Sequence, residues 1–131
     1  MSKKIIHTDL APQAIGTYSQ AVRVGQVVYI SGQIPLVPGT MQLISSDIHA
    51  QVKQVFENLQ AIVHASQATF DEIVKVTIYL TDLTHFALVN EVMAHYFQAP
   101  YPARAVLGVQ SLPRGAQIEI EAIIIQTKEL A

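Results

Sequence analysis

Cysteine is absent from the 131 residues, and charged residues of both signs are scarce. The lack of cysteine excludes a disulfide scaffold, a thiolate metal site and a cysteine nucleophile. Lysine and arginine number 8 against 10 aspartates and glutamates, and the resulting net charge of −2 offers no cationic surface to a phosphate backbone. The composition therefore disfavours nucleic acid as a partner.

Charged residues make up only 14% of the chain, whereas apolar residues make up 50%. An average soluble domain has about 25% charged residues, and one domain of this length exposes roughly 7,000 Å² of surface. The charged side chains are too few to cover that surface, and exposed apolar patches beyond a few hundred Å² usually mark interfaces. We therefore expect residues 1–131 to form a single domain that associates with copies of itself.

Long apolar runs and targeting signals are missing as well. No run of about 20 apolar residues occurs, and the N-terminus continues into the polar His7, Thr8 and Asp9 rather than into the apolar core of a signal peptide. The sequence thus predicts a cytoplasmic protein that does not enter a membrane.

Motifs for common cofactors and nucleophiles are also lacking. The six glycines form neither a GxGxxG nor a GxxxxGK pattern, and the five histidines are scattered without metal-ligand spacing. No serine has the context of a nucleophile elbow. We expect no metal, no nucleotide, no other cofactor and no serine nucleophile.

The first half of the chain predicts a hairpin and a helix. Residues 21–30 form the hairpin, with Gly25 in a two-residue turn where φ must be positive. Apolar residues then recur at steps of three and four through 48–63, which is typical of an amphipathic helix. Ser46 or Asp47 is the expected N-cap of this helix.

The second half predicts three strands and another helix. Residues 74–80 alternate as a half-buried strand, and Thr84 caps a helix whose apolar face extends to Phe97. Strands at 103–109 and 116–127 follow. The order ββαβαββ indicates an α+β fold with both helices on one face of a sheet. Since no third long helix is available, sheet faces meeting around an oligomer axis would cover the opposite face.

Arg104 is an unusual cation in an apolar strand, flanked by Ala103, Ala105 and Val106. Two interpretations are open. The guanidinium forms a salt bridge outside the edge of the strand, or it lies in an apolar cleft and holds a carboxylate bidentately.

Glu119 and Glu121 alternate with Ile118 and Ile120, so both acids share one face of a strand. Two interpretations are open here as well. The glutamates form a solvated outer face, or a carboxylate opposite an arginine-lined pocket positions and polarises a water for attack on an electrophilic carbon.

Two turn-rich polar segments, 15–21 and 31–35, adjoin apolar strands and contain Tyr18 and Gly32. Loops of this kind often form sites. Alternatively, their glycines serve only the backbone geometry.

These residues fall into ordered blocks: Ile15–Ala21, Ser31–Pro35, Gln51–Asn58, Val76–Asp82, Val89–Val92, Tyr101–Arg104 and Leu112–Ala122. With these blocks the chain resembles, from about Pro12 to the C-terminus, the RidA family, formerly called YjgF. The resemblance implies a chorismate-mutase-like α+β fold with a mixed β-sheet and two helices on one face. It also implies a homotrimer whose sheets form a central β-barrel, with three clefts between neighbouring subunits.

The same resemblance implies an activity and its residues. Active members of the family hydrolyse 2-iminobutanoate and 2-iminopropanoate, which pyridoxal-phosphate enzymes such as threonine dehydratase release, to 2-keto acids and ammonium without any cofactor. By position, Arg104 binds the substrate carboxylate and Glu119 holds the attacking water. Tyr18, Gly32 and Asn90 line the cleft, and Asn90 and the backbone near Gly32 help to orient the substrate.

The chain departs from the family pattern at three positions. Thr17 replaces a common proline, and Val106 replaces a common cysteine. Near Gln67 the glycine that ends the first helix in many relatives is missing, so we expect a non-glycine residue in a strained or different turn there.

Two further function classes stay open. One is a non-catalytic, chaperone-like or metabolite-binding trimer that uses the same cleft for a small carboxylate. The other is a ribonuclease or translation inhibitor, which the 8 basic residues and the absence of a His–His or His–Lys constellation disfavour.

Overall fold

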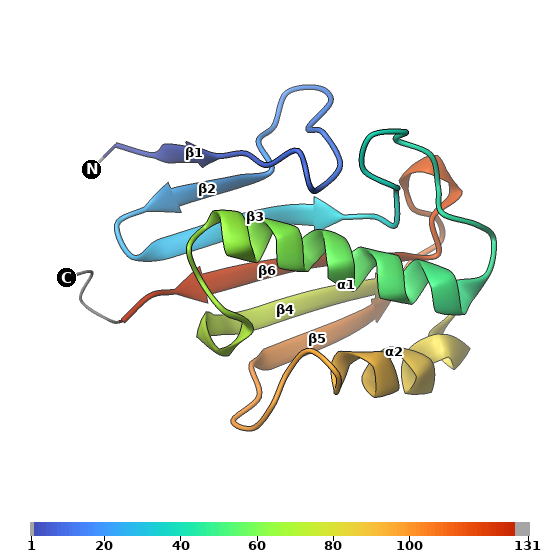
Figure 1. Cartoon of the computed structure of the whole chain (residues 1–131). Coiled ribbons are helices and arrows are strands. Elements are labelled where there is room, and N and C mark those ends of the chain that lie inside the picture. The colour runs from blue at the N-terminus through green and yellow to red at the C-terminus, as the bar shows by residue number, and fades with distance from the viewer. Residues whose placement is uncertain (1, 128–131) are drawn as a thin grey trace.

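A computed structural model describes residues 2–127 and joins all their strands in one mixed sheet (Figure 1). The elements are β1 (Lys4–Ile6), β2 (Ala21–Val24), β3 (Val27–Gln33), α1 (Ile48–Ala65), β4 (Ile73–Leu80), α2 (Phe86–Met93), β5 (Ala103–Gly108) and β6 (Ile118–Ile125). Across the sheet the order is β1-β2-β3-β6-β4-β5, and only β4 and β5 run parallel. The predicted strands are all present, and β1 is an addition that is too short to show an alternating pattern. The domain predicted over 1–131 includes residue 1 and residues 128–131, which lie outside the described part.

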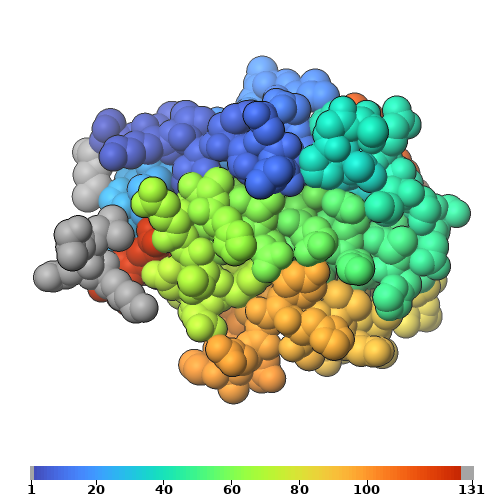
Figure 2. All heavy atoms as spheres, in the orientation of Figure 1, coloured from blue at the N-terminus to red at the C-terminus, as the bar shows by residue number. Residues whose placement is uncertain are grey.

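Both helices lie on one face of this sheet, as predicted (Figure 1). α1 runs across the middle strands, and α2 packs beside α1 near the β5 edge. In the space-filling view of this side, α1 in green and the α2 region in gold cover most of the sheet (Figure 2). Within residues 2–127, neither helix is long and apolar enough to cross a membrane.

The sheet buries one set of alternate residues and leaves the other set open. On β6, Ile118, Ile120 and Ile124 are fully buried in the core beneath the helices. On the opposite face, a row in register crosses all six strands through Ile5, Val22, Tyr29, Ile123, Lys75 and Ala103. Ile5 and Tyr29 are more than half exposed, and no helix of the described chain covers them. The sequence predicts that another copy of the chain covers this face.

The first helix ends in a motif that normally uses glycine. Asp47 caps its start by accepting a hydrogen bond from the Ala50 amide at 3.0 Å, as predicted. At the other end, the amide of Gln67 donates to the His64 carbonyl and the amide of Ala68 donates to the Val63 carbonyl, which is a Schellman motif. Gln67 has φ +59, so the expected strained, non-glycine turn is confirmed.

Replacing Gln67 by glycine should stabilise the protein. A left-handed conformation costs a residue with a Cβ roughly 1–2 kcal/mol, and the extra freedom of glycine in the unfolded chain offsets part of this gain. We expect Gln67→Gly to raise the free energy of unfolding by about 0.5–1 kcal/mol in urea denaturation at fixed protein concentration. Gln67→Ala keeps the strain and serves as the control, and a lower stability of the glycine variant would contradict the assignment.

The second helix begins and ends differently from the prediction. Thr84 does not cap it, because its amide and hydroxyl both donate to Asp82, at 2.9 and 2.7 Å, within the 3₁₀ turn Leu83–His85. The helix also stops at Met93 rather than reaching Phe97. The amide of Tyr96 donates to the Met93 carbonyl in a tighter turn, and the Tyr96 ring stacks on Phe56 of α1.

Candidate active site

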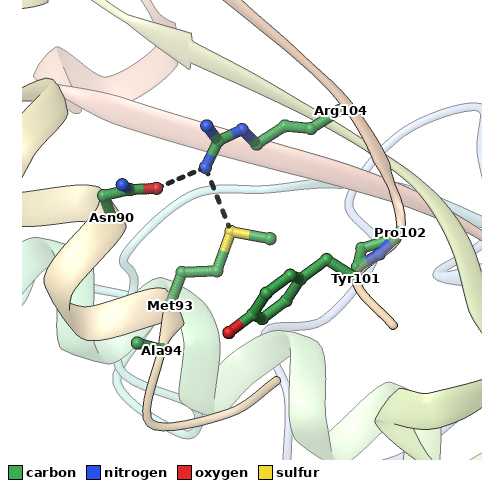
Figure 3. A pocket seen from close by; sticks show the side chains of 6 residues that line it. All are labelled: Asn90, Met93, Ala94, Tyr101, Pro102 and Arg104. Atoms are coloured by element: carbon green, nitrogen blue, oxygen red, sulfur yellow. Dashed lines mark hydrogen bonds between the residues drawn. The ribbon is translucent and has the colours of Figure 1, made fainter. Parts of the chain in front are cut away.

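Arg104 lies on β5 at the edge of the sheet, and its side chain points to the helix-covered side next to α2 (Figure 3). It lines a cavity of about 480 Å³ together with Asn90, Met93, Ala94, Tyr101 and Pro102. Arg104 pairs with no carboxylate of residues 2–127, so this part of the chain lacks the strand-edge salt bridge considered for it. The cavity therefore contains a cation whose charge no described residue neutralises.

The guanidinium of Arg104 is held from one side only. Its Nη1 donates to Asn90 Oδ1 at 2.6 Å and approaches Met93 Sδ at 3.7 Å (Figure 3). Its Cζ lies 5.0 Å from the centre of the Phe86 ring, within the range of a cation–π contact. The Nε and Nη2 edge makes no hydrogen bond within residues 2–127. That edge presents two parallel N–H groups, the geometry that a carboxylate accepts bidentately.

Glu119 and Gly32 meet in a second cavity, of about 520 Å³. A Cβ on Gly32 would lie 2.8 Å from Glu119 Cδ and closer still to Oε2, so the missing side chain of the glycine makes room for the carboxylate. The backbone approaches through a β-bulge, because Ser31 and Gly32 both fall opposite Glu121 where the register shifts. Tyr18, half exposed, lines the same cavity.

Two buried amides hold the loops that wall this second cavity. Gln20 donates to the Pro12 carbonyl at 2.8 Å. Asn58, on α1, donates to the carbonyls of Ile34 and Leu36 at 3.1 and 2.9 Å. Because buried carbonyls need such partners, the two side chains fix two loops that line the same cavity as Glu119.

The environment of Glu119 favours its neutral form. Burial raises the pKa of the Glu119 carboxyl, and the negative charge of Glu121 raises it further. Glu121 in turn accepts a hydrogen bond from the Tyr79 hydroxyl at 2.7 Å, which raises the pKa of Tyr79. A carboxylate whose pKa lies closer to neutrality is a better proton acceptor at the pH of the cell.

The predicted site residues fall into two groups that one copy of the chain does not bring together. Tyr18, Gly32 and Glu119 line one cavity, and Asn90 and Arg104 line the other. Glu119 alternates with the buried Ile118 and Ile120 and so faces away from the helices, whereas Arg104 contacts α2. The two charged groups are therefore on opposite faces of the sheet. Any site that uses both must draw them from two copies.

Sequence reasoning missed two residues that support Arg104. The sequence predicts no role in the site for Phe86 or Met93, yet both contact the guanidinium. Phe86 lies four residues before Asn90 and Met93 three after it, so the three share one face of a helix. That spacing was the available signal, and it becomes informative only once Asn90 is known to face Arg104.

The structure also brings histidines closer than the sequence suggested. His49, Lys53 and His95 line one cavity between α1 and α2, contrary to the expected absence of a His–His or His–Lys constellation. Its volume of about 180 Å³ is below the roughly 300–1,000 Å³ of ordinary ligand sites. Residues 2–127 contain no group of three His, Asp or Glu residues that could hold a metal ion.

Comparisons with known proteins agree over nearly the whole chain. Residues 8–126 match the family model described as Endoribonuclease L-PSP. Protein DfrA of Myxococcus xanthus is 51% identical over 127 residues, which cover 95% of this chain and 97% of DfrA. The 2-iminobutanoate/2-iminopropanoate deaminase of Dermatophagoides farinae is 46% identical, covering 94% of this chain and 96% of that protein.

A solved structure gives the same answer for the fold. The crystal structure of RidA from the Antarctic bacterium Psychrobacter sp. PAMC 21119 superimposes with a TM-score of 0.90 at 49% identity, covering 94% of this chain and 99% of that one. Sequence and fold thus agree, and the chain belongs to the Endoribonuclease L-PSP family, the RidA (YjgF) group.

Proposed function

We propose that this protein is a cofactor-free deaminase that hydrolyses 2-imino acids such as 2-iminobutanoate and 2-iminopropanoate. The reaction is R–C(=NH₂⁺)–COO⁻ + H₂O → R–CO–COO⁻ + NH₄⁺. The observation that carries the proposal is the pre-positioned guanidinium of Arg104 in an open cavity, where it pairs with no carboxylate of residues 2–127. The names of relatives at 46% identity support the same reaction. The substrates would come from pyridoxal-phosphate enzymes that release imines.

Arg104 binds the substrate carboxylate through its Nε and Nη2 edge, while Asn90 holds Nη1. Glu119 accepts a proton from a water as the water attacks the imine carbon, which gives a tetrahedral aminoalcohol. The same proton then passes to the nitrogen. The C–N bond breaks as the carbonyl forms, and the departing ammonia takes up the hydroxyl proton to give ammonium. Because a protonated imine is already electrophilic, positioning the water supplies most of the required acceleration.

The site would form between copies of a homotrimer. The open sheet face is apolar along the row from Ile5 to Ile123, and three such faces around an axis would build a central barrel. Each cleft would then receive Arg104 and Asn90 from one copy and Tyr18, Gly32 and Glu119 from its neighbour. This arrangement accounts for two half-sites on opposite faces of one chain.

The decisive measurement is the decay of 2-iminobutanoate, made in situ from threonine by a dehydratase and trapped with semicarbazide. We expect wild type to accelerate the decay and Arg104→Ala to leave it at the buffer rate. Loss of a charged, bidentate contact predicts at least about a hundredfold lower kcat/KM. Arg23→Ala, which removes a cation bonded to the Ser66 carbonyl instead, is the control for the loss of charge. If wild type does not exceed buffer, the non-catalytic carboxylate-binding trimer becomes the better interpretation.

Glu121→Gln should move the acidic limb of the activity profile to lower pH. Glu119 must be ionised to accept a proton, so kcat/KM falls as the pH drops through its pKa. Glu121 raises that pKa, and removing its charge lowers it. Glutamine still accepts the hydrogen bond from Tyr79. The matched control is Glu57→Gln on α1, where Glu57 accepts from the Tyr96 hydroxyl. An unchanged acidic limb in Glu121→Gln would contradict the role of Glu119.

A further inference from the structure

The cavity around Glu119 contains a second charged group that the proposed reaction does not use. Arg114 lines this cavity, in the turn just before β6. Its Nη1 donates to the carbonyl of Met41, which lines the same cavity, at 3.3 Å. Among residues 2–127 it forms no other hydrogen bond through its side chain and pairs with no carboxylate. Most of the guanidinium donors are therefore available to a ligand.

The backbone at this wall is strained at both residues. Arg114 has φ +61 and Met41 has φ +60, in the left-handed region that disfavours any residue with a Cβ. The next residue, Gly115, has φ +72, and glycine adopts this conformation without strain. Strained residues of this kind cluster at functional sites. The chain thus keeps an arginine side chain here in spite of an unfavourable backbone conformation.

The size and charge of the cavity indicate what the arginine binds. About 520 Å³ lies in the range that encloses drug-sized ligands, more than a four-carbon monocarboxylic imino acid requires. Among residues 2–127, the only charged side chains lining the cavity are Glu119 and Arg114. A ligand with a second carboxylate would be repelled by Glu119 unless Arg114 received that carboxylate.

We propose that Arg114 binds the distal carboxylate of 2-imino dicarboxylic acids of four or five carbons, which makes this substrate class a preferred one. The inference rests on the proposed function. The α-carboxylate goes to Arg104 of the neighbouring copy, the imine carbon lies at Glu119, and the side chain extends toward Arg114. Hydrolysis is the same balanced reaction, in which water replaces the imine nitrogen and ammonium leaves.

The test compares two reaction products of equal length, 2-oxoglutarate and 2-oxopentanoate, in calorimetric titrations of the assembled protein. They differ only in the distal carboxylate. We expect wild type to bind 2-oxoglutarate at least about tenfold more tightly, as a charged hydrogen bond predicts. Arg114→Gly should abolish this preference while relieving the strained backbone, and Arg114→Lys should retain part of it. Lys53→Gln, which removes a cation from α1 outside this cavity, should keep the preference.

The outcomes separate this inference from the deaminase itself. A preference that is absent in wild type, or unchanged in Arg114→Gly, overturns the role of Arg114 even if 2-iminobutanoate is hydrolysed. A preference that disappears in Arg114→Gly supports the subsite even if imine hydrolysis fails, in which case the deaminase alone is overturned. A merely structural Arg114 predicts instead that Arg114→Gly lowers the thermal stability and weakens both ligands equally.

Discussion

Gly32→Ala should reduce kcat/KM for 2-iminobutanoate by about a hundredfold while leaving the protein folded, because misplacing a reacting group by about 1 Å has effects of this size. The added Cβ would occupy the position of the Glu119 carboxylate. Since that carboxylate is the end of a flexible side chain, it can rotate away at little cost in stability. The water that it holds moves with it. The variant therefore separates activity from stability.

Gly39→Ala is the control for this experiment. Gly39 has φ +89 and nothing within 4 Å of its Cβ position, so alanine strains the backbone without touching the site. We expect it to lower the free energy of unfolding by roughly 1 kcal/mol and to leave kcat/KM unchanged, the opposite pattern to Gly32→Ala. Wild-type activity in Gly32→Ala would mean that the position of the Glu119 carboxylate does not matter for the reaction.

Gly32 also illustrates the limit of the sequence. Its neighbourhood marks a loop beside a strand, and the resemblance places it in the cleft. Its contact with Glu119 depends on the pairing of β3 with β6 and on a bulge that shifts the register. Neither is encoded in a local pattern, because pairing joins segments almost ninety residues apart along the chain. The glycine can be predicted from sequence, but the reason for it cannot.

The helices and strands are easier to predict from the sequence, since the periodicity of each segment indicates its type. Asp47 and the turn at Gly25 follow from local chemistry, and the left-handed Gln67 follows from a glycine that is missing. The prediction for Thr84 is wrong because the neighbouring Asp82 is the stronger acceptor and accepts a hydrogen bond from the Thr84 hydroxyl. Local sequence rules do not decide which of two neighbouring capping residues accepts the hydrogen bond.

Predicting the site requires more than the local pattern and the fold class, because it depends on the order in which the strands pair. Arg104 and Glu119 are both candidates from the sequence, yet the faces that they occupy become clear only from the pairing of the strands. Glu119 alternates with buried residues of β6, and Arg104 pairs with the buried Val76 of β4. That order places them on opposite faces. Because they lie on opposite faces, a site that uses both side chains requires a second copy of the chain.

Two inactive variants should therefore restore activity when they share an oligomer. Arg104→Ala and Glu119→Gln, denatured together and refolded as an equal mixture, should regain about a quarter of wild-type activity. In a cyclic assembly each cleft draws one residue from each of two neighbours, and the chance that both are intact is about one half times one half. Each variant refolded alone has no intact cleft and should stay near the buffer rate.

The matched control mixes Glu119→Gln with Gly32→Ala. Both positions belong to the same cavity of the same chain, so every cleft in this mixture has one defect or the other, and no activity should return. Recovery in the first mixture but not in the second would assign Arg104 to one copy and Glu119 with Gly32 to its neighbour. Differently tagged chains verify that mixed oligomers have formed. If such oligomers recover no activity in either mixture, the result contradicts a shared cleft. Arg104 and Glu119 would then not share a cleft between copies, and the open sheet face would serve assembly alone.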